Sequence, residues 1–180
     1  MEAIKYLDLK QAVIDHGFID DITWAKNIKP CMDPWKFCLE YIFVVCNSGM
    51  KSQIARQIFN KILGAIDDKR PCSDVFGHKG KAKAIDYMRV HYNGIFKEYQ
   101  KAPDKLEFCR GLPWIGDITK YHLVKNLGID CIKPDRHLVR IANKYDTDPF
   151  SMCEELKHVT GDSLNTIDTT IWRAANLGIV

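Results

Sequence analysis

Apolar residues recur at the spacing of a helix along most of the chain. In one segment four isoleucines lie four residues apart, at Ile54, Ile58, Ile62 and Ile66. This spacing predicts a helix with an apolar stripe that faces a core. No segment alternates strictly between apolar and polar residues, and no Asn-Gly or Asp-Gly pair separates two β-like runs. The pattern therefore predicts an all-α chain of about eight to ten short helices.

Capping signals indicate where several of these helices begin. Asp33-Pro34 and Asp148-Pro149 each place a capping aspartate before a proline at the first helical position. Asp104 and Glu107 have the spacing of a capping box. We therefore expect helices to start at each of these three places.

Other signals indicate where helices end. A helix that begins near Lys79 is expected to stop before Asn93-Gly94, because both residues disfavour a helix interior. A second helix is expected over residues 117–127, with Gly128 as its C-terminal stop.

Composition narrows the class of protein. The chain has 180 residues, of which 46% are hydrophobic and 27% charged, so disordered and collagen-like classes are excluded. This length permits one compact domain or two small lobes. The longest apolar run, over 41–46, is too short to cross a bilayer, and the N-terminus lacks the apolar region of a signal peptide. We therefore expect a soluble, cytoplasmic protein.

The seven cysteines form no CxxC pair, at Cys31, Cys38, Cys46, Cys72, Cys109, Cys131 and Cys153. Reduced, buried thiols are the expectation for such a set in an intracellular protein, with metal binding as the less favoured alternative. The six histidines show no metal-ligand spacing. Neither a metal nor an organic cofactor is therefore expected.

The net charge of +3 hides an uneven distribution. Residues 69–140 contain 15 Lys and Arg against 8 Asp and Glu, whereas the remainder contains 11 against 15. A basic segment between acidic ends is either a solvated surface or a patch that faces phosphates. Charge alone does not choose between the two.

The most informative segment runs from Arg110 to Lys120. A short helix, a turn rich in Pro and Gly, and a second helix predict a helical hairpin. The turn places backbone N–H groups at the positive end of the second helix, which suits a phosphate. Many helical hairpins contain glycine and bind nothing, so this segment alone leaves both interpretations open.

The order of motifs resembles the helix-hairpin-helix DNA glycosylase superfamily. That family has an L-P-G-[IV]-G hairpin, a helix, and then V-D-x-H at the start of the next helix. Here the two parts read Leu112-Pro113-Trp114-Ile115-Gly116 and Pro134-Asp135-Arg136-His137. Softer matches lie upstream in Lys81-Ala82 and downstream over 167–172. The resemblance covers roughly Asp33 to the C-terminus.

This resemblance implies two helical lobes, one of about 30–130 and the other of about 1–29 plus 135–180, with an active-site cleft between them. It implies that Asp135 is the catalytic carboxylate and that His137 is a structural residue that supports Asp135 without contacting the substrate. The simpler interpretation of Asp135 as a helix N-cap is compatible with that role. His137 on its own is more often a packing residue.

The resemblance also assigns residues to DNA. Phosphate-binding positions are Gly111, Trp114, Gly116, Thr119, Lys79 and Lys81, with Lys83 and Arg89 as further candidates. Positions that fill the gap left by an extruded nucleotide are Asn47, Ser48, Met50 and Lys51. Candidates for stacking on the extruded base are Trp24, Trp35, Tyr41 and Trp172. Solvated lysines, a plain helix–helix turn and core aromatics are the respective alternatives.

Three departures from the family pattern refine the expectation. Trp114 replaces a hairpin glycine, so a positive φ there would be strained and the turn reshaped. Ile118 occupies the position of the nucleophilic lysine of bifunctional members, and Lys120 lies about 200° around the helix from it. The only cysteine after residue 131 is Cys153, so the iron–sulfur cluster of some members has no ligands.

The sequence therefore predicts a monomeric, monofunctional DNA glycosylase that acts on double-stranded DNA. Alkylated purines or mismatched thymine and uracil are the expected targets, and hypermodified thymine is an alternative seen in some phage relatives. A non-catalytic helix-hairpin-helix DNA-binding protein is the alternative from a different class. Motif order alone does not identify the base.

Overall fold

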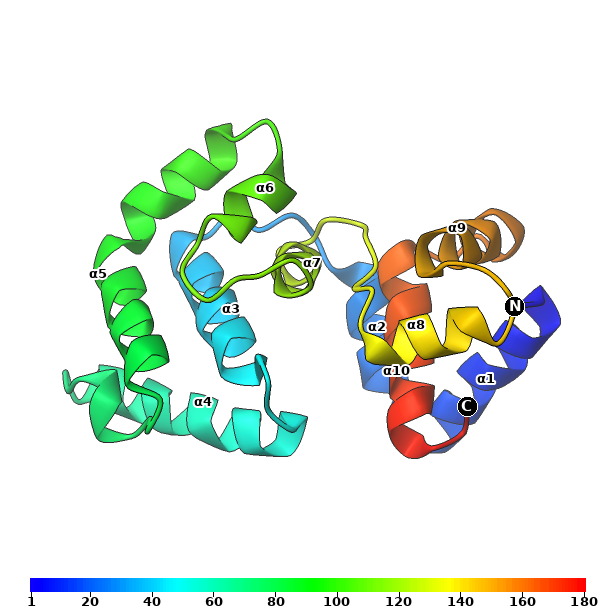
Figure 1. Cartoon of the computed structure of the whole chain (residues 1–180), viewed down its shortest axis with the longest axis horizontal. Helices are drawn as coiled ribbons and strands as arrows, with labels where there is room; N and C mark the ends of the chain where they lie inside the picture. The colour runs from blue at the N-terminus through cyan, green and yellow to red at the C-terminus, as the bar shows by residue number, and fades with distance from the viewer. The chain divides into compact units, whose positions relative to one another are not determined.

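The computed structural model describes all 180 residues and is helical throughout, with no strand (Figure 1). The helices are α1 (Ala3–Asp15), α2 (Ile19–Asn27), α3 (Pro34–Asn47), α4 (Ser52–Asp67), α5 (Lys79–Lys101), α6 (Lys105–Arg110), α7 (Thr119–Asn126), α8 (Arg136–Asn143), α9 (Pro149–Thr160) and α10 (Leu164–Leu177). A 3-10 turn, η1 (Cys72–Asp74), precedes α5. The all-α prediction is confirmed.

The chain divides into two compact units. Unit 1 consists of Met1–Pro30 and Gly128–Val180, and unit 2 consists of Cys31–Leu127. Unit 1 contains α1, α2 and α8 to α10, whereas unit 2 contains α3 to α7. Unit 2 is thus one continuous segment of chain, and unit 1 is built from the segments on either side of it.

Helix α10 is the centre of unit 1. It packs against α1, α2, α8 and α9, and every residue from Leu164 to Ile171 is buried. A helix enclosed on all sides needs apolar partners around it, and Tyr6 and Ile141 are among the fully buried side chains of this core. The core therefore fixes α8, which begins at the predicted catalytic aspartate.

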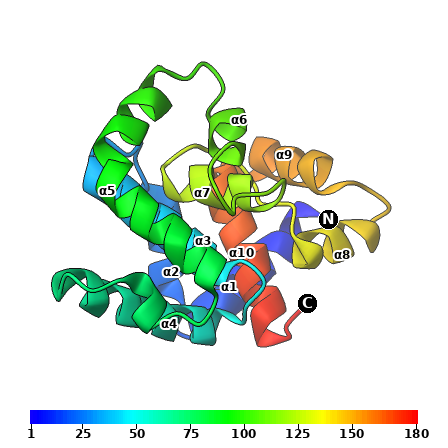
Figure 2. The ribbon, with the colours of Figure 1, turned by 60° about the vertical axis from the view of Figure 1, so that its left-hand side comes forward.

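Helix α3 is the centre of unit 2 and contacts α4, α5 and α7. Figures 1 and 2 show α5 running alongside it. The predicted stop at Asn93-Gly94 is wrong, because α5 continues to Lys101. The rings of Phe96 and Tyr99, beyond the expected stop, lie 5.6 Å and 5.1 Å from that of Phe37. This packing outweighs the low helix propensity of the Asn-Gly pair.

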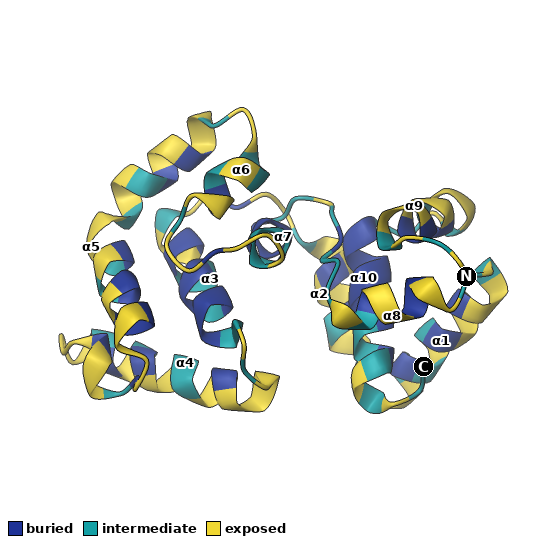
Figure 3. Cartoon of the chain, in the orientation of Figure 1, coloured by how far each residue is buried: buried dark blue, intermediate teal, exposed yellow.

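The isoleucine stripe of α4 is only partly a core stripe. Ile62 is fully buried, but Ile54 in the first turn is 49% exposed. Figure 3 shows buried and exposed residues alternating along this helix. The stripe is therefore half exposed at Ile54, near the N-terminus of α4, and reaches the core at Ile62.

The predicted helix starts are confirmed by their caps. Asp33 accepts a hydrogen bond from the N–H of Lys36, and Asp148 accepts from Phe150 and Ser151. Asp104 likewise accepts from the first turn of α6. The capping box is only half formed, because the Glu107 carboxylate bonds elsewhere, as described below.

Gly128 follows the end of α7 with φ +89°, as its predicted role as a stop requires. A Cβ at this position would collide with the carbonyl of Lys29.

All seven cysteines are free, and all except Cys131 are buried. The longest and most apolar helices still fall short of what a membrane-spanning segment requires.

Candidate functional site

The hairpin between α6 and α7 is built on a tight turn. The N–H of Ile115 donates to the carbonyl of Leu112 at 3.1 Å, with Pro113 second and Trp114 third in the turn. Trp114 has φ +63°. Proline followed by a residue of positive φ is the pattern of a type II turn. The turn is therefore not reshaped, because Trp114 itself adopts the conformation that favours glycine.

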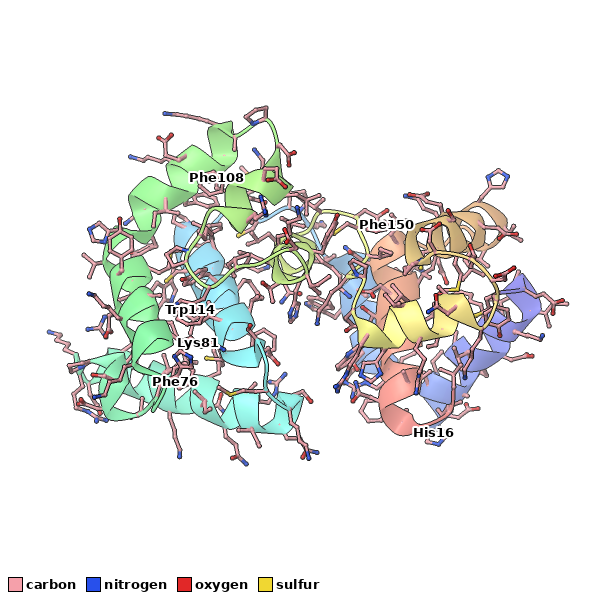
Figure 4. All side chains as sticks on the ribbon, viewed as in Figure 1. His16, Phe76, Lys81, Phe108, Trp114 and Phe150 are labelled. Atoms are coloured by element: carbon pink, nitrogen blue, oxygen red, sulfur yellow. The ribbon has the colours of Figure 1, made fainter.

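The indole of Trp114 is held by the first turn of α5. Its ring meets that of His78 edge-on, with centroids 4.7 Å apart. A Cβ on Gly80 would lie 2.7 Å from Cζ2 of Trp114, so only glycine leaves room for the indole. Figure 4 labels Trp114 together with Phe76 and Lys81, which are all in unit 2. These contacts offset the strain of the positive φ.

Tyr41 supports the turn from the other side, and its predicted role in a base pocket is wrong. Its side chain is fully buried in α3, and its hydroxyl donates to the carbonyl of Pro113 at 2.8 Å. Burial also raises the pKa of this hydroxyl. Tyr41 is therefore a core residue that anchors the hairpin to α3.

The predicted phosphate donors of the hairpin are only partly available. The N–H of Gly111 donates to the carbonyls of Glu107 and Phe108, and the N–H of Gly116 donates to Oγ1 of Thr119 at 2.7 Å. These two glycines are therefore not free donors.

Four other N–H groups of the hairpin have no acceptor in the protein, those of Trp114, Asp117, Ile118 and Thr119. The last three are consecutive and lie at the start of α7, where the helix dipole is positive. This is the part of the hairpin best suited to an anion. The predicted donors Trp114 and Thr119 belong to this set, and Asp117 and Ile118 are additional donors that were not named individually.

Ion pairs neutralise the acidic side chains of the hairpin. Arg110 Nε lies 2.6 Å from Oδ1 of Asp117, and Lys120 Nζ lies 2.6 Å from Oε1 of Glu107. The hydrogen bond from Lys120 lowers the pKa of Glu107, and the same bond raises the pKa of Lys120. An open surface hollow of about 380 Å³ lies here, lined by Glu107, Arg110, Gly111, Ile115, Gly116 and Asp117.

The basic residues at the start of α5 divide into exposed and buried. Lys79 and Lys83 are exposed, as a phosphate contact requires. Lys81 is only 5% exposed, and its Nζ donates to the carbonyl of Ser48 at 2.5 Å. Arg89 is engaged with Asp86 and with the backbone. The predicted phosphate contact of Lys81 is therefore wrong, since its ammonium points into unit 2.

The predicted gap-filling residues form the connection between α3 and α4. Asn47 ends α3, and its side-chain amide donates to the carbonyl of Phe43 at 2.8 Å. Gly49 turns the chain with φ +74°, and the N–H of Met50 donates back to the carbonyl of Asn47. Met50 is half-buried and Lys51 exposed. The segment is thus a compact turn, with its role in DNA still a prediction.

The remaining stacking candidates lie in different units. Trp35, at the start of α3, is 37% exposed and meets Tyr92 edge-on at 5.4 Å. Trp24 is on α2 of unit 1 and is 44% exposed. Trp172 is half-buried on α10 and lies against the guanidinium of Arg173. Each remains a prediction.

Asp135 is the N-cap of α8, in unit 1. Its Oδ1 accepts hydrogen bonds from the N–H groups of His137 at 2.9 Å and Leu138 at 3.3 Å. Its Oδ2 faces the ammonium of Lys133 at 3.4 Å. The side chain is 15% exposed. One oxygen is therefore committed to the helix, whereas the other has an ammonium group as its only partner.

His137 contacts Asp135 through its backbone N–H rather than its ring. Any residue at this position of α8 would donate the same backbone hydrogen bond, so a supporting role of the imidazole stays a prediction. Lys133 was missed by the sequence reasoning, although a lysine two residues before the aspartate was a visible signal. No three His, Cys, Asp or Glu side chains lie close enough together to hold a metal ion.

Comparison with known proteins finds one solved structure with a similar fold. No protein-family model and no curated protein sequence matches the chain. Among solved structures, it is similar to the 8-oxoguanine DNA glycosylase of Methanocaldococcus jannaschii, with a TM-score of 0.67 and 19% sequence identity. The similarity covers 98% of this chain and 94% of that chain. The resemblance inferred from motif order is thus supported at the level of the fold.

Proposed function

We propose that this protein is a DNA glycosylase that hydrolyses the N-glycosidic bond of a base in double-stranded DNA. The observation that carries the proposal is Asp135, held at the N-terminus of α8 with Oδ2 bonded to no backbone donor. The fold shared with an 8-oxoguanine DNA glycosylase and the hairpin upstream of Asp135 support the same conclusion.

Asp135 would stabilise the charge that develops during bond cleavage. As the bond between C1′ and the base breaks, positive charge accumulates on the sugar, and a fixed carboxylate beside it lowers the barrier. The two N–H groups of α8 fix the orientation of this carboxylate before DNA arrives. Preorganisation of this kind avoids the cost of turning the group during the reaction.

The same carboxylate would activate the attacking water. Oδ2 accepts a proton from the water as the water oxygen bonds to C1′. The leaving base takes the electron pair of the broken bond and a proton from solvent, and Asp135 returns its proton to solvent. The products are the free base and a sugar with a hydroxyl at C1′. The target nucleotide is extruded first, because the bond cannot be attacked inside the stack.

The hairpin would bind one phosphate of the backbone. The consecutive N–H groups of Asp117, Ile118 and Thr119 point to an anion at the start of α7. The exposed ammonium groups of Lys79 and Lys83 supply further, sequence-independent attraction. Arg110 neutralises Asp117, which would otherwise repel the phosphate.

A purely hydrolytic reaction fits the lysines of the hairpin. A lysine acts as a nucleophile only as the neutral amine. Ile118 occupies the position of the family's nucleophile, and Lys120 is protonated in its ion pair with Glu107, which raises its pKa. We therefore propose a monofunctional enzyme.

The test is release of free base from a panel of duplexes. The panel contains alkylated purines, mismatched thymine and uracil, 8-oxoguanine and hypermodified thymine, each compared with undamaged DNA. We expect the wild-type protein to release one class of base. Asp135→Asn should keep DNA binding and lower base release by at least about 100-fold.

Asp148→Asn is the matched control. Asp148 caps α9 with an equivalent pair of backbone hydrogen bonds, but it lies on a different helix. Each of the two aspartates also has a proline as its neighbour in sequence. Asparagine is also a good N-cap, so both variants should fold.

If the wild-type protein binds every duplex and releases nothing, the non-catalytic DNA-binding function replaces this proposal.

A further inference from the structure

Lys81 is a buried cation without an anionic partner. Its side chain lies inside unit 2, and its ammonium donates to the carbonyl of Ser48 at 2.5 Å. No carboxylate forms an ion pair with it, and burial lowers its pKa. A buried charge of this kind is costly for folding, so its presence calls for a role other than stability.

The acceptor of Lys81 is in the connection between α3 and α4. Ser48 is the C-cap of α3, where helix carbonyls are unsatisfied and the dipole is negative. The ammonium therefore holds the first residue after α3, directly before the turn at Gly49. It fixes where the segment from Asn47 to Met50 leaves the helix.

The same turn of α5 also holds the hairpin. Gly80 receives the indole of Trp114, and the ring of His78 meets it edge-on. His78 Nδ1 in turn accepts from the N–H of Lys81 at 3.3 Å, which caps the helix. Within this one turn of α5, His78 and Gly80 thus contact the hairpin tip, and Lys81 contacts the connection between α3 and α4.

We propose that Lys81 is a positioning residue for nucleotide extrusion, which holds the segment Asn47–Met50 at a fixed spacing from the phosphate-binding hairpin. The inference rests on the proposed function. A phosphate bound at the hairpin then sets the place along the DNA at which Asn47–Met50 meets the base stack. Exposed lysines attract DNA through their charge, whereas the buried Lys81 aligns the hairpin and the segment Asn47–Met50, which both contact DNA.

The experiment separates binding from gap filling. We measure affinity for an intact duplex and for the same duplex with a tetrahydrofuran abasic site, by fluorescence anisotropy. The duplex carries 2-aminopurine opposite the abasic site, so insertion of protein into the gap changes its emission. The wild-type protein should prefer the abasic duplex, because Asn47–Met50 fills the gap.

Lys81→Met keeps the length of the side chain and removes the charge. We expect its affinity for the intact duplex to stay within about twofold of wild type, while its preference for the abasic duplex falls about tenfold and the 2-aminopurine response is lost. Lys81→Arg should restore most of both. Lys83→Met, an exposed lysine on the same helix, should lower both affinities equally and leave the preference unchanged.

Hydrogen exchange gives a second measurement on the free protein. The hydrogen-bonded amides of Ser48 and Met50 should exchange faster in Lys81→Met than in Lys83→Met, because the connection has lost its anchor. An unchanged abasic preference in a folded Lys81→Met protein overturns the inference and leaves the glycosylase proposal standing. A wild-type protein that binds neither duplex overturns the proposed function instead.

Discussion

The indole of Trp114 occupies the space in which a side chain on Gly80 would stand, with Cζ2 of the indole 2.7 Å from where a Cβ would be. A tryptophan with positive φ and a glycine on a neighbouring helix are therefore one structural unit. The turn keeps its positive φ at Trp114, and the glycine on α5 supplies the space that the indole needs. Each residue explains why the other is tolerated.

The strain at Trp114 can be measured with two truncations. Trp114→Ala and Trp114→Gly both remove the indole, but only alanine keeps a Cβ at φ +63°. We expect Trp114→Gly to be more stable than Trp114→Ala by about 1 kcal/mol, measured by urea unfolding. Equal stabilities would mean that the turn relaxes once the indole is gone.

Lys120 should form no covalent intermediate with DNA. Its ammonium is paired with Glu107, which raises its pKa and keeps it protonated at neutral pH. Incubation with a cleavable duplex and borohydride should therefore yield no trapped adduct. Efficient trapping that disappears in Lys120→Ala, but persists in Lys125→Ala, would show that the enzyme is bifunctional after all.

The hairpin should lose stability in acid. The pKa of Glu107 lies below its usual value, because Lys120 hydrogen-bonds the charged form. Its contribution is therefore complete above the pKa of an unfolded glutamate, about 4.3, and is lost as the pH falls through the lower folded value. Thermal unfolding from pH 7 down to about 3 should show a smaller loss in Glu107→Gln than in wild type. Glu98→Gln, an exposed glutamate on α5, should behave like wild type.

DNA binding should weaken with salt, although less steeply than the basic excess of residues 69–140 suggests. Lys81 is buried, and Arg110 and Lys120 are paired with carboxylates. Only a few cations of the hairpin region remain for phosphates. We expect affinity to fall roughly tenfold between about 50 and 200 mM salt. Affinity that does not change with salt would contradict nucleic-acid binding altogether.

Local signals in the sequence were enough to predict much of the fold. Asp33 and Asp148 cap their helices as expected, since a cap depends on residues within one turn. The continuation of α5 through Asn93-Gly94 was not predictable in this way. It depends on Phe37, which is distant in sequence, and tertiary packing outweighs propensity.

In the candidate site too, contacts within one helical turn were predictable from the sequence, whereas contacts between residues far apart in the sequence were not. The N-cap role of Asp135 was predictable because its hydrogen-bond partners lie in the next turn, and its catalytic role stays a prediction. Lys81 was misassigned to a phosphate, because a lysine in a first helical turn is ordinarily solvated and its acceptor, Ser48, lies 33 residues away. Tyr41 was misassigned for the same reason, as its contact is with Pro113.

The ends of unit 2 meet. The N–H of Cys31, its first residue, donates to the carbonyl of Leu127, its last, at 2.8 Å. A segment whose two termini are one hydrogen bond apart is a closed module, which a short loop can seal without disturbing its helices. The hairpin, Lys81 and the α3–α4 connection all lie within that module. The residues proposed to bind a phosphate and to fill the gap therefore lie in one loop of chain that opens and closes at a single point, whereas Asp135 lies outside it.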